Sequence, residues 1–329
     1  MKILIAGSLS NAGGYEEELL VKELEKEYKS MKYDVDSFIL PFSRDILSLP
    51  EQILAYQLID TNCCDLLITV GYPACMLSHP NKVIYLFERV PAFNEYYDSE
   101  YGVQASYQYE KIKNTISQIE KKVFLEAKKV FCNSKLLLGD LSIYMNVEKE
   151  VLYPPALEIE KNSNLTNSNY IMIETDLLPY NRSELLITFA KCNTQYDINI
   201  FIPSENLVYY ETMVKWIKSE KLGHQIKLIQ QRATEEDYKN ASAYVLMDYN
   251  NRRISNSIIM AMENQIPIIA CKDCGASMEL LVDYPLLKEI EADNIKSFKL
   301  VELNKATNQN KNSMRFNKTR FFAESLVNI

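Results

Sequence analysis

The stretch Lys2-Ile3-Leu4-Ile5-Ala6-Gly7 places four consecutive apolar side chains before a glycine. Such a run predicts a strand that is buried on both faces, as the strands of a parallel sheet are. A polar loop with Gly13 and Gly14 follows, and residues 16–29 then carry leucines at helical spacing. Strand, loop and helix in this order form the repeating unit of an α/β fold.

The same alternation runs along the chain and breaks once. Before the break, further strands are predicted at residues 35–40, 65–71, 82–87 and 128–132. Regular structure is expected to stop where residues 151–153 meet Pro154-Pro155. Residues 158–169 are polar and rich in Asn and Ser, which is typical of a connection between domains. After the break, strands are predicted at 170–173, 198–203, 226–229, 243–247 and 267–271, and helices at 184–191, 206–220 and 256–263. The pattern predicts two Rossmann-like, doubly wound parallel-sheet domains, 1–157 and 158–312, with the binding site in a cleft between them.

The composition excludes several classes of function. The 329 residues carry 36 Lys and Arg against 44 Asp and Glu, a net charge of −8, which argues against a sequence-independent grip on nucleic acid. Two histidines cannot supply a three-histidine metal site, and Cys271 and Cys274 have no second Cys pair at zinc-site spacing, so no metal is expected. The apolar runs are too short for a membrane span or a signal peptide, which predicts a cytoplasmic protein.

Seven short motifs, in order along the chain, resemble those of one enzyme family. They are Gly13-Gly14-Tyr15-Glu16, residues 85–98, Ala127–Ser134, Val151–Pro155, Leu177–Arg182, Met260–Met262 and Pro267–Ala270. Together they resemble motifs of family-4 retaining glycosyltransferases, such as Gly-Gly-x-Glu, A-x-x-V-x-x-N-S and V-x-Y-P-P. The stretch at 85–98 is most similar to that of mannosyl- and rhamnosyltransferases of O-antigen and capsule synthesis.

The resemblance implies a fold and an activity. The fold is GT-B, an α/β architecture in which an acceptor-side and a donor-side Rossmann-like domain face each other across a cleft. The C-terminal helix, within residues 313–329, is expected to return to the first domain. The activity is transfer of a sugar from a nucleotide-sugar to a glycan or lipid-linked acceptor of the cell surface. It needs no metal and no cofactor, because backbone N–H groups and a helix dipole stabilise the leaving diphosphate.

Several positions depart from the family's pattern. Asp176 and Asn181 stand where the family has the Arg and Lys that hold the diphosphate, and Arg252 and Met260 stand where it has two glutamates. Phe87 occupies the place of the family's first-domain histidine. An aspartate repels a diphosphate and a methionine accepts hydrogen bonds poorly. The donor site therefore does not match the family's usual chemistry.

In the first domain, the candidate residues follow the predicted strand at 82–87. Glu88 is a candidate catalytic base, with an ion pair inside the domain as the alternative. Arg89, Tyr96 and Tyr97 are candidates for acceptor binding, with ordinary packing as the alternative for the tyrosines. The lysine-rich helical pattern at 111–129 fits a helix packed on the sheet, and contact with anionic lipid at the inner face of the membrane is the alternative.

The candidate donor-binding residues come from both domains: Gly13, Gly14, Arg182, Arg252, Arg253 and Glu279. The glycines fit either a close approach to phosphate or a tight turn. The arginines fit either a phosphate site or a solvated loop with surface ion pairs. Glu279 stands near the position of the family's ribose-binding carboxylate.

Two functions from different classes fit these features. One is an active, metal-independent glycosyltransferase that binds a nucleotide-sugar and an acceptor. The other is a catalytically inactive relative that serves as a partner or acceptor-binding subunit of a second glycosyltransferase, which the departures from the donor pattern favour.

Overall fold

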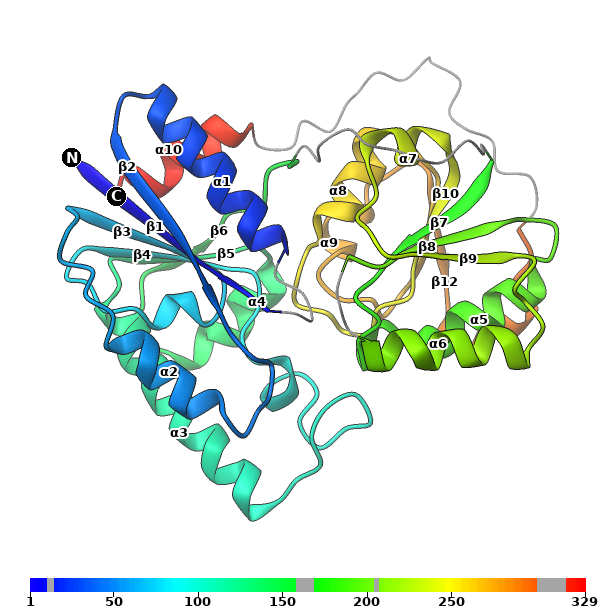
Figure 1. Cartoon of the computed structure of the whole chain (residues 1–329), viewed down its shortest axis with the longest axis horizontal. Coiled ribbons are helices and arrows are strands. Elements are labelled where there is room, and N and C mark those ends of the chain that lie inside the picture. Colours follow the sequence, from blue (N-terminus) through cyan, green and yellow to red (C-terminus); the bar gives the residue numbers. More distant parts are fainter. Residues whose placement is uncertain (11–14, 158–168, 204–206, 301–317) are drawn as a thin grey trace. The chain divides into compact units, whose positions relative to one another are not determined.

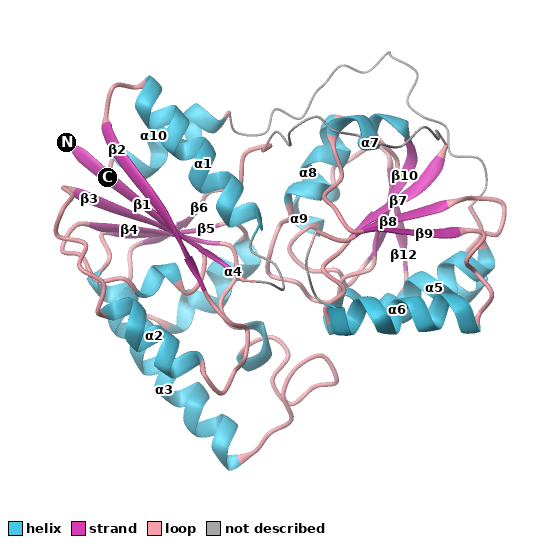
Figure 2. Ribbon diagram, viewed as in Figure 1, coloured by secondary structure: helices cyan, strands magenta, loops and turns pink. Residues whose placement is uncertain are grey.

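The computed structural model describes residues 1–10, 15–157, 169–203, 207–300 and 318–329 (Figures 1 and 2). The chain divides into two compact units. The first unit comprises residues 1–157, 252–254 and 316–329, and the second comprises 158–251 and 255–315. Each unit contains one parallel sheet with helices on its faces, which confirms the predicted Rossmann-like α/β architecture.

The first unit is built on a six-stranded sheet. Its strands are β1 (Lys2–Leu9), β2 (Asp34–Pro41), β3 (Leu66–Val70), β4 (Lys82–Leu86), β5 (Lys129–Cys132) and β6 (Lys149–Val151). They lie in the order β2-β1-β3-β4-β5-β6, and every neighbouring pair is parallel. The strand order reverses between β1 and β3, so the switch point of this sheet lies where these two strands end.

Helices cover both faces of the first sheet (Figure 1). One face carries α1 (Tyr15–Ser30) and α10 (Thr319–Val327), and the other carries α2 (Leu49–Gln57), α3 (Tyr107–Glu126) and α4 (Lys135–Asp140). In β1, Ile3 and Ile5 join the core under α1 and α10, whereas Leu4 and Ala6 join the core under α2 and α3. Successive side chains of a strand point to opposite faces, so a strand between two helix layers must be apolar throughout.

The C-terminal helix α10 packs on α1. The Tyr28 hydroxyl donates a hydrogen bond to the carbonyl of Ala323 at 2.8 Å, and the Phe322 ring lies edge-on to Tyr85 with 4.8 Å between ring centres. Phe322, Ala323 and Leu326 are fully buried. Residues 313–317 of the expected C-terminal helix lie outside the described residues.

The lysine-rich helix α3 is packed on the sheet. It begins after Ser106, whose hydroxyl accepts a hydrogen bond from the N–H of Tyr109 and caps the helix. Ile116, Val123 and Phe124 bury its apolar face in the first core. Within the described ranges, no helix combines the length and the apolar character that crossing a bilayer requires. All seven cysteines are free thiols.

The second unit holds the other six-stranded sheet. Its strands are β7 (Tyr170–Glu174), β8 (Ile198–Phe201), β9 (Ile226–Ile229), β10 (Ala241–Leu246), β11 (Ile268–Cys271) and β12 (Leu287–Ile290). The helices are α5 (Ser183–Cys192), α6 (Leu207–Ser219), α7 (Glu235–Asn240), α8 (Asn256–Glu263) and α9 (Met278–Leu281). The order β12-β11-β10-β7-β8-β9 is the dinucleotide-fold order, with its switch point between β7 and β10.

Several elements were not predicted from the sequence, and three of them, β12, α2 and α7, lack a clear pattern. The edge strand β12 exposes Lys288 and Glu289, so it contains no apolar run. In α2, the exposed Leu54, together with the exposed Leu58 that follows the helix, obscures the helical spacing of its buried residues. The helix α7 spans 6 residues, which is too short for a periodicity to emerge.

Candidate functional site

At the switch point of the second sheet, the loops that follow β7 and β10 are joined. The turn after β7 ends at Tyr180-Asn181-Arg182, and Met247 and Asp248 directly follow β10. The N–H of Tyr249 donates to the carbonyl of Tyr180 at 2.8 Å, which links the two loops. Because open α/β sheets bind ligands at this position, these loops form the candidate site of the second unit.

Several hydrogen bonds hold the guanidinium of Arg182. Its Nη1 and Nη2 donate to the two carboxylate oxygens of Asp273 at 2.9 and 2.8 Å, and its Nε donates to the carbonyl of Met247 at 2.6 Å. Its backbone is left-handed, with φ of 49°, a conformation that needs support from its surroundings. Only 3% of the residue is exposed, so Arg182 does not lie in the solvated loop considered from the sequence.

A second carboxylate, Asp248, lies close to Arg182 and is held mainly by neutral groups. It accepts hydrogen bonds from Asn181 Nδ2 at 2.8 Å and from Asn251 Nδ2 at 2.9 Å. Burial raises the pKa of Asp248 above its usual value, although the two amides and Arg182 act in the opposite direction. Asp248 and Asp273 together offset the positive charge that Arg182 would offer to a diphosphate.

The loop after β11 approaches the end of β10 very closely. Gly275 has φ of 92°, and a Cβ at this position would lie 2.2 Å from the carbonyl oxygen of Asn251. The N–H of Ala276 donates to that same carbonyl at 2.7 Å. The short helix α9 starts directly after this loop, so the close approach positions its half-buried Glu279.

At the carboxyl end of the first sheet, Arg253 is held by two glutamates from the first turn of α1. Its guanidinium donates to Glu16 Oε2 at 3.0 and 2.8 Å and to both carboxylate oxygens of Glu17 at 2.9 and 2.8 Å. Burial raises the pKa of Glu17, but Arg253 outweighs that effect and leaves the pKa below its usual value. Gly13 and Gly14, which precede this helix, lie outside the described residues.

Glu88 joins the same group of charges. It follows β4, and its Oε1 lies 3.4 Å from Arg44 Nη2 and 4.0 Å from Arg253 Nη1. Its side chain is 10% exposed. Glu88 therefore takes part in ion pairs inside the first unit, the arrangement that the sequence offered as the alternative to a catalytic base.

Arg252 binds two acids unequally. Its Nε donates to Asp140 Oδ2 at 2.6 Å but lies 3.8 Å from Glu95 Oε1. The side chain of Glu95 is 2% exposed, and neither of its carboxylate oxygens accepts a hydrogen bond from any residue that the structure describes. Burial raises the pKa of Glu95 to about 7, despite the nearby Arg252. Glu95 is thus a buried carboxyl group that titrates near neutrality.

The three acceptor candidates differ in accessibility. Arg89 is buried, and its Nε donates to Glu120 Oε2 at 3.2 Å while its Nη2 donates to the hydroxyl of Tyr144 at 2.8 Å. Tyr96 is 2% exposed. Tyr97 is half-buried, and Lys113 Nζ lies 4.0 Å from the centre of its ring. Of the three, only Tyr97 retains substantial exposed surface.

Sequence reasoning missed the acids that surround the arginines. Glu17, Glu95, Asp140, Asp248 and Asp273 were not singled out, although the last two follow predicted strands and could have been found by that position. Across the described ranges, no group of three or more His, Cys, Asp and Glu side chains converges as a metal site would. The chemistry on offer is hydrogen bonding, charge and one carboxyl group of near-neutral pKa.

Comparisons with known proteins bear on the fold. No protein-family model and no curated protein matches the sequence. Sucrose-phosphate synthase from Thermosynechococcus elongatus is similar in structure, with a TM-score of 0.65 and 13% identity over 90% of this chain and 87% of that one. Anabaena Alr3699/HepE, solved with UDP and glucose, has a TM-score of 0.62 and 15% identity over 99% of this chain and 95% of its own. WaaG, a glycosyltransferase involved in lipopolysaccharide biosynthesis, has a TM-score of 0.65 and 10% identity over 90% and 89%.

At these identities the likeness concerns architecture. The alignment with HepE covers 99% of the chain and so takes in both six-stranded parallel sheets and their flanking helices. The predicted fold is confirmed: the chain has the GT-B fold of these glycosyltransferases.

Proposed function

We propose that the chain is a glycosyltransferase-like protein of the family-4 type. It transfers a sugar from a nucleotide-sugar to a glycan or lipid-linked acceptor in the assembly of a cell-surface glycan. The observation that carries the proposal is the GT-B architecture, which aligns over 99% of the chain with a protein solved with UDP and glucose. The polar networks at the carboxyl ends of both sheets support it, because doubly wound sheets bind ligands there.

In this proposal the second unit binds the nucleotide-sugar. Glu279 accepts hydrogen bonds from the ribose, and Arg182 supplies positive charge for the diphosphate. The other donor candidates, Arg252, Arg253, Gly13 and Gly14, belong to the first unit, which would offer positive charge and backbone N–H groups. The first unit binds the acceptor through Tyr97, since Arg89 and Tyr96 are buried. Glu88 acts as the base for the acceptor hydroxyl.

A melting experiment with nucleotide-sugars tests the proposal. The protein is titrated with UDP-, GDP-, ADP- and dTDP-sugars, and a donor at a hundred times its Kd is expected to stabilise the fold by about 2.7 kcal/mol. Glu279→Gln should weaken the response, whereas Glu289→Gln, at an exposed position of β12, should not. A melting temperature that stays constant with every donor would overturn the proposal.

One observation favours the second candidate function, an inactive partner of another glycosyltransferase. The guanidinium groups of Arg182, Arg252 and Arg253 are each hydrogen-bonded to carboxylates, which weakens their attraction for a diphosphate. This candidate predicts co-purification with an active glycosyltransferase and no turnover by the isolated chain. Transfer or hydrolysis of a nucleotide-sugar by the purified protein alone would rule it out.

The proposal places the protein in the cytoplasm, at the inner face of the membrane where a lipid-linked acceptor would be met. The exposed lysines of α3, Lys111, Lys121 and Lys122, would contact anionic headgroups. Sedimentation with vesicles tests this contact, which should require anionic lipid and weaken with salt. Equal sedimentation with neutral vesicles would contradict it.

A further inference from the structure

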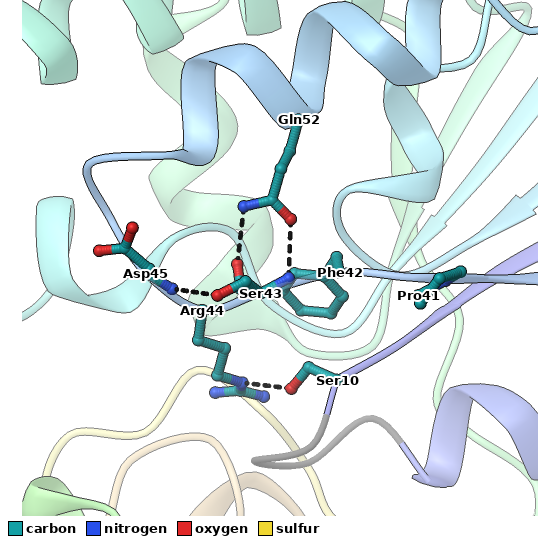
Figure 3. Close-up of a pocket in the computed structure, with 7 residues that line it drawn as sticks. All are labelled: Ser10, Pro41, Phe42, Ser43, Arg44, Asp45 and Gln52. Atoms are coloured by element: carbon teal, nitrogen blue, oxygen red, sulfur yellow. Dashed lines mark hydrogen bonds between the residues drawn. The ribbon is translucent and has the colours of Figure 1, made fainter.

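A pocket opens at the carboxyl ends of β1 and β2 within the first unit (Figure 3). Its volume is about 550 Å³, in the range of sites for small molecules. Its walls come from Ser10 at the end of β1, from the segment Phe42–Asp45 after β2, and from Gln52 of α2. Neither the donor candidates nor the acceptor candidates from the sequence belong to it.

The loop that forms most of this pocket is held in place by its own hydrogen bonds. Gln52 Oε1 accepts from the N–H of Ser43 at 2.7 Å, and Gln52 Nε2 donates to the Ser43 carbonyl at 3.0 Å (Figure 3). The Asp45 carboxylate accepts from the N–H groups of Leu47 and Ser48 at 3.3 and 3.2 Å. Gln52 and Asp45 are thus committed to shaping the loop, and a preformed loop lowers the cost of binding.

Three side chains of this loop and strand end combine an apolar surface with polar groups. The half-buried Phe42 ring packs against the core under α2 and α3 and also lines the pocket. The exposed Ser43 carries a hydroxyl that accepts from the N–H of Asp45 at 3.1 Å, and a hydroxyl can accept and donate at once. Arg44 extends toward Ser10, with 3.3 Å between its Nε and the Ser10 hydroxyl (Figure 3). An aromatic face beside hydroxyl and guanidinium groups suits a ring with an apolar face and a polar rim.

The charges around the pocket disfavour an anionic ligand. Arg44 Nη2 lies 3.4 Å from Glu88, which also lies 4.0 Å from Arg253, and Arg253 is bonded to Glu16 and Glu17. Three carboxylates, Glu88, Glu16 and Glu17, thus lie against these two guanidinium groups, and Asp45 adds a fourth to the pocket lining. The local charge is therefore negative, and a carboxylate or phosphate on the ligand would be repelled.

We infer that this pocket binds an uncharged sugar ring, with Phe42 against its apolar face and Ser43 and Arg44 on its hydroxyl groups. Glu88 and Asp45 exclude sugars that carry a carboxylate or a phosphate. The inference deepens the proposed function and rests on it for one point, that this sugar is part of the acceptor. What it adds is that the acceptor carries an uncharged sugar.

Saturation-transfer NMR on the full chain tests the inference. The probes are the methyl glycosides of glucose, galactose and mannose, compared with glucuronic acid and glucose 6-phosphate. At least one neutral glycoside should bind, at least tenfold more tightly than both anionic probes. Phe42→Leu and Ser43→Ala should each weaken that binding at least threefold. Phe321→Leu, at an exposed aromatic of α10, should leave it unchanged.

A charge variant sharpens the test. Glu88→Gln should raise the affinity for glucuronic acid relative to that for the neutral glycoside at least threefold. Melting temperatures of all variants show whether each is folded. The inference is overturned if no neutral glycoside binds, if the anionic probes bind as tightly, or if binding persists unchanged in Phe42→Leu and Ser43→Ala.

The outcome is distinguishable from that of the proposed function. Binding of a neutral glycoside in this pocket, together with no response to any nucleotide-sugar, overturns the proposed function and leaves a sugar-binding protein. A response to a nucleotide-sugar without any glycoside binding overturns the pocket assignment alone.

Discussion

The carboxyl ends of the two sheets are both polar, but different interactions stabilise them. In the first unit, Arg253 is enclosed by Glu16 and Glu17, so buried charge pairs stabilise the carboxyl end of this sheet. In the second unit, Arg182 pairs with Asp273, whose side chain is 44% exposed. There Asn181 and Asn251 also bond Asp248, and the backbone of Gly275 lies close to Asn251, so neutral amides and close backbone contact add to a partly solvated ion pair. One architecture, used twice, thus relies on buried charge pairs at the carboxyl end of one sheet and on mixed contacts at the carboxyl end of the other.

The largest expected loss of stability follows from breaking the charge pairs at the carboxyl end of the first sheet. Arg253→Met leaves two buried glutamates without their guanidinium, and breaking a buried ion pair costs about 3–5 kcal/mol. Urea denaturation of both proteins at pH 7 measures the loss. Arg320→Met breaks an exposed pair with Glu324 and should cost about 0.5 kcal/mol or less.

A second variant isolates the cause. Adding Glu16→Gln and Glu17→Gln to Arg253→Met removes the uncompensated charges and should recover most of the lost stability. If Arg253→Met lowers the free energy of unfolding no more than Arg320→Met does, charge pairs do not stabilise the carboxyl end of the first sheet. The contrast between the two sheets then fails.

At the carboxyl end of the second sheet, the corresponding test adds a single methyl group. Gly275→Ala places a Cβ 2.2 Å from the Asn251 carbonyl oxygen and forces alanine into φ of 92°, which should cost about 3 kcal/mol. Gly139→Ala is the matched control: an added Cβ there meets no described atom within 4 Å, and alanine favours its helix, so stability should rise slightly. Equal thermal stability of the two variants would contradict the close-contact account.

Glu95 makes the stability of the first unit depend on pH, which can be tested. Its pKa of about 7 in the folded state exceeds that of an unfolded glutamate, so its contribution is complete at low pH and is lost as pH rises through 7. Glu95→Gln removes this loss, so the variant should gain stability over the wild type between pH 5 and pH 8, by at most about 3 kcal/mol.

Denaturation curves at several pH values measure this gain. Glu100→Gln, at an exposed glutamate in the same region, serves as the control and should show no such trend. A difference between Glu95→Gln and the wild type that stays constant from pH 5 to pH 8 would show that Glu95 does not titrate in this range.

The smallest expected effect is at Arg182. Arg182→Lys keeps the charge but loses the paired contact with Asp273 and the bond to the Met247 carbonyl. Asp273 is 44% exposed, so water screens the pair, and we expect a loss of about 1–2 kcal/mol in urea. Lys191→Arg, in an exposed pair with Glu220, should change stability by less than about 0.5 kcal/mol. A loss of stability as large as that of Arg253→Met would show that buried charge pairs stabilise the carboxyl ends of both sheets alike.

The sequence was a good guide to strands with local signals and a poor guide to the partners of charged residues. The runs at residues 3–6 and 268–271 are buried strands because apolar side chains next to one another leave few alternatives. Position after a predicted strand also brought attention to Glu88, and the family resemblance of residues 177–182 brought attention to Arg182. Neither revealed that Arg182 bonds Asp273, 91 residues further along, or that Arg253 bonds Glu16, 237 residues earlier.

The order of strands and helices, and with it the doubly wound α/β class, was determined by the sequence alone, because hydrophobic spacing is a property of neighbouring residues. Only the tertiary structure decided which charges neutralise one another, which loop forms the pocket beside Phe42, and that Glu95 is buried next to an arginine that bonds another acid. These outcomes depend on distances and burial between segments far apart in the chain. The energy of a charge changes with its burial and with the separation of its partner, and neither quantity is written in local sequence.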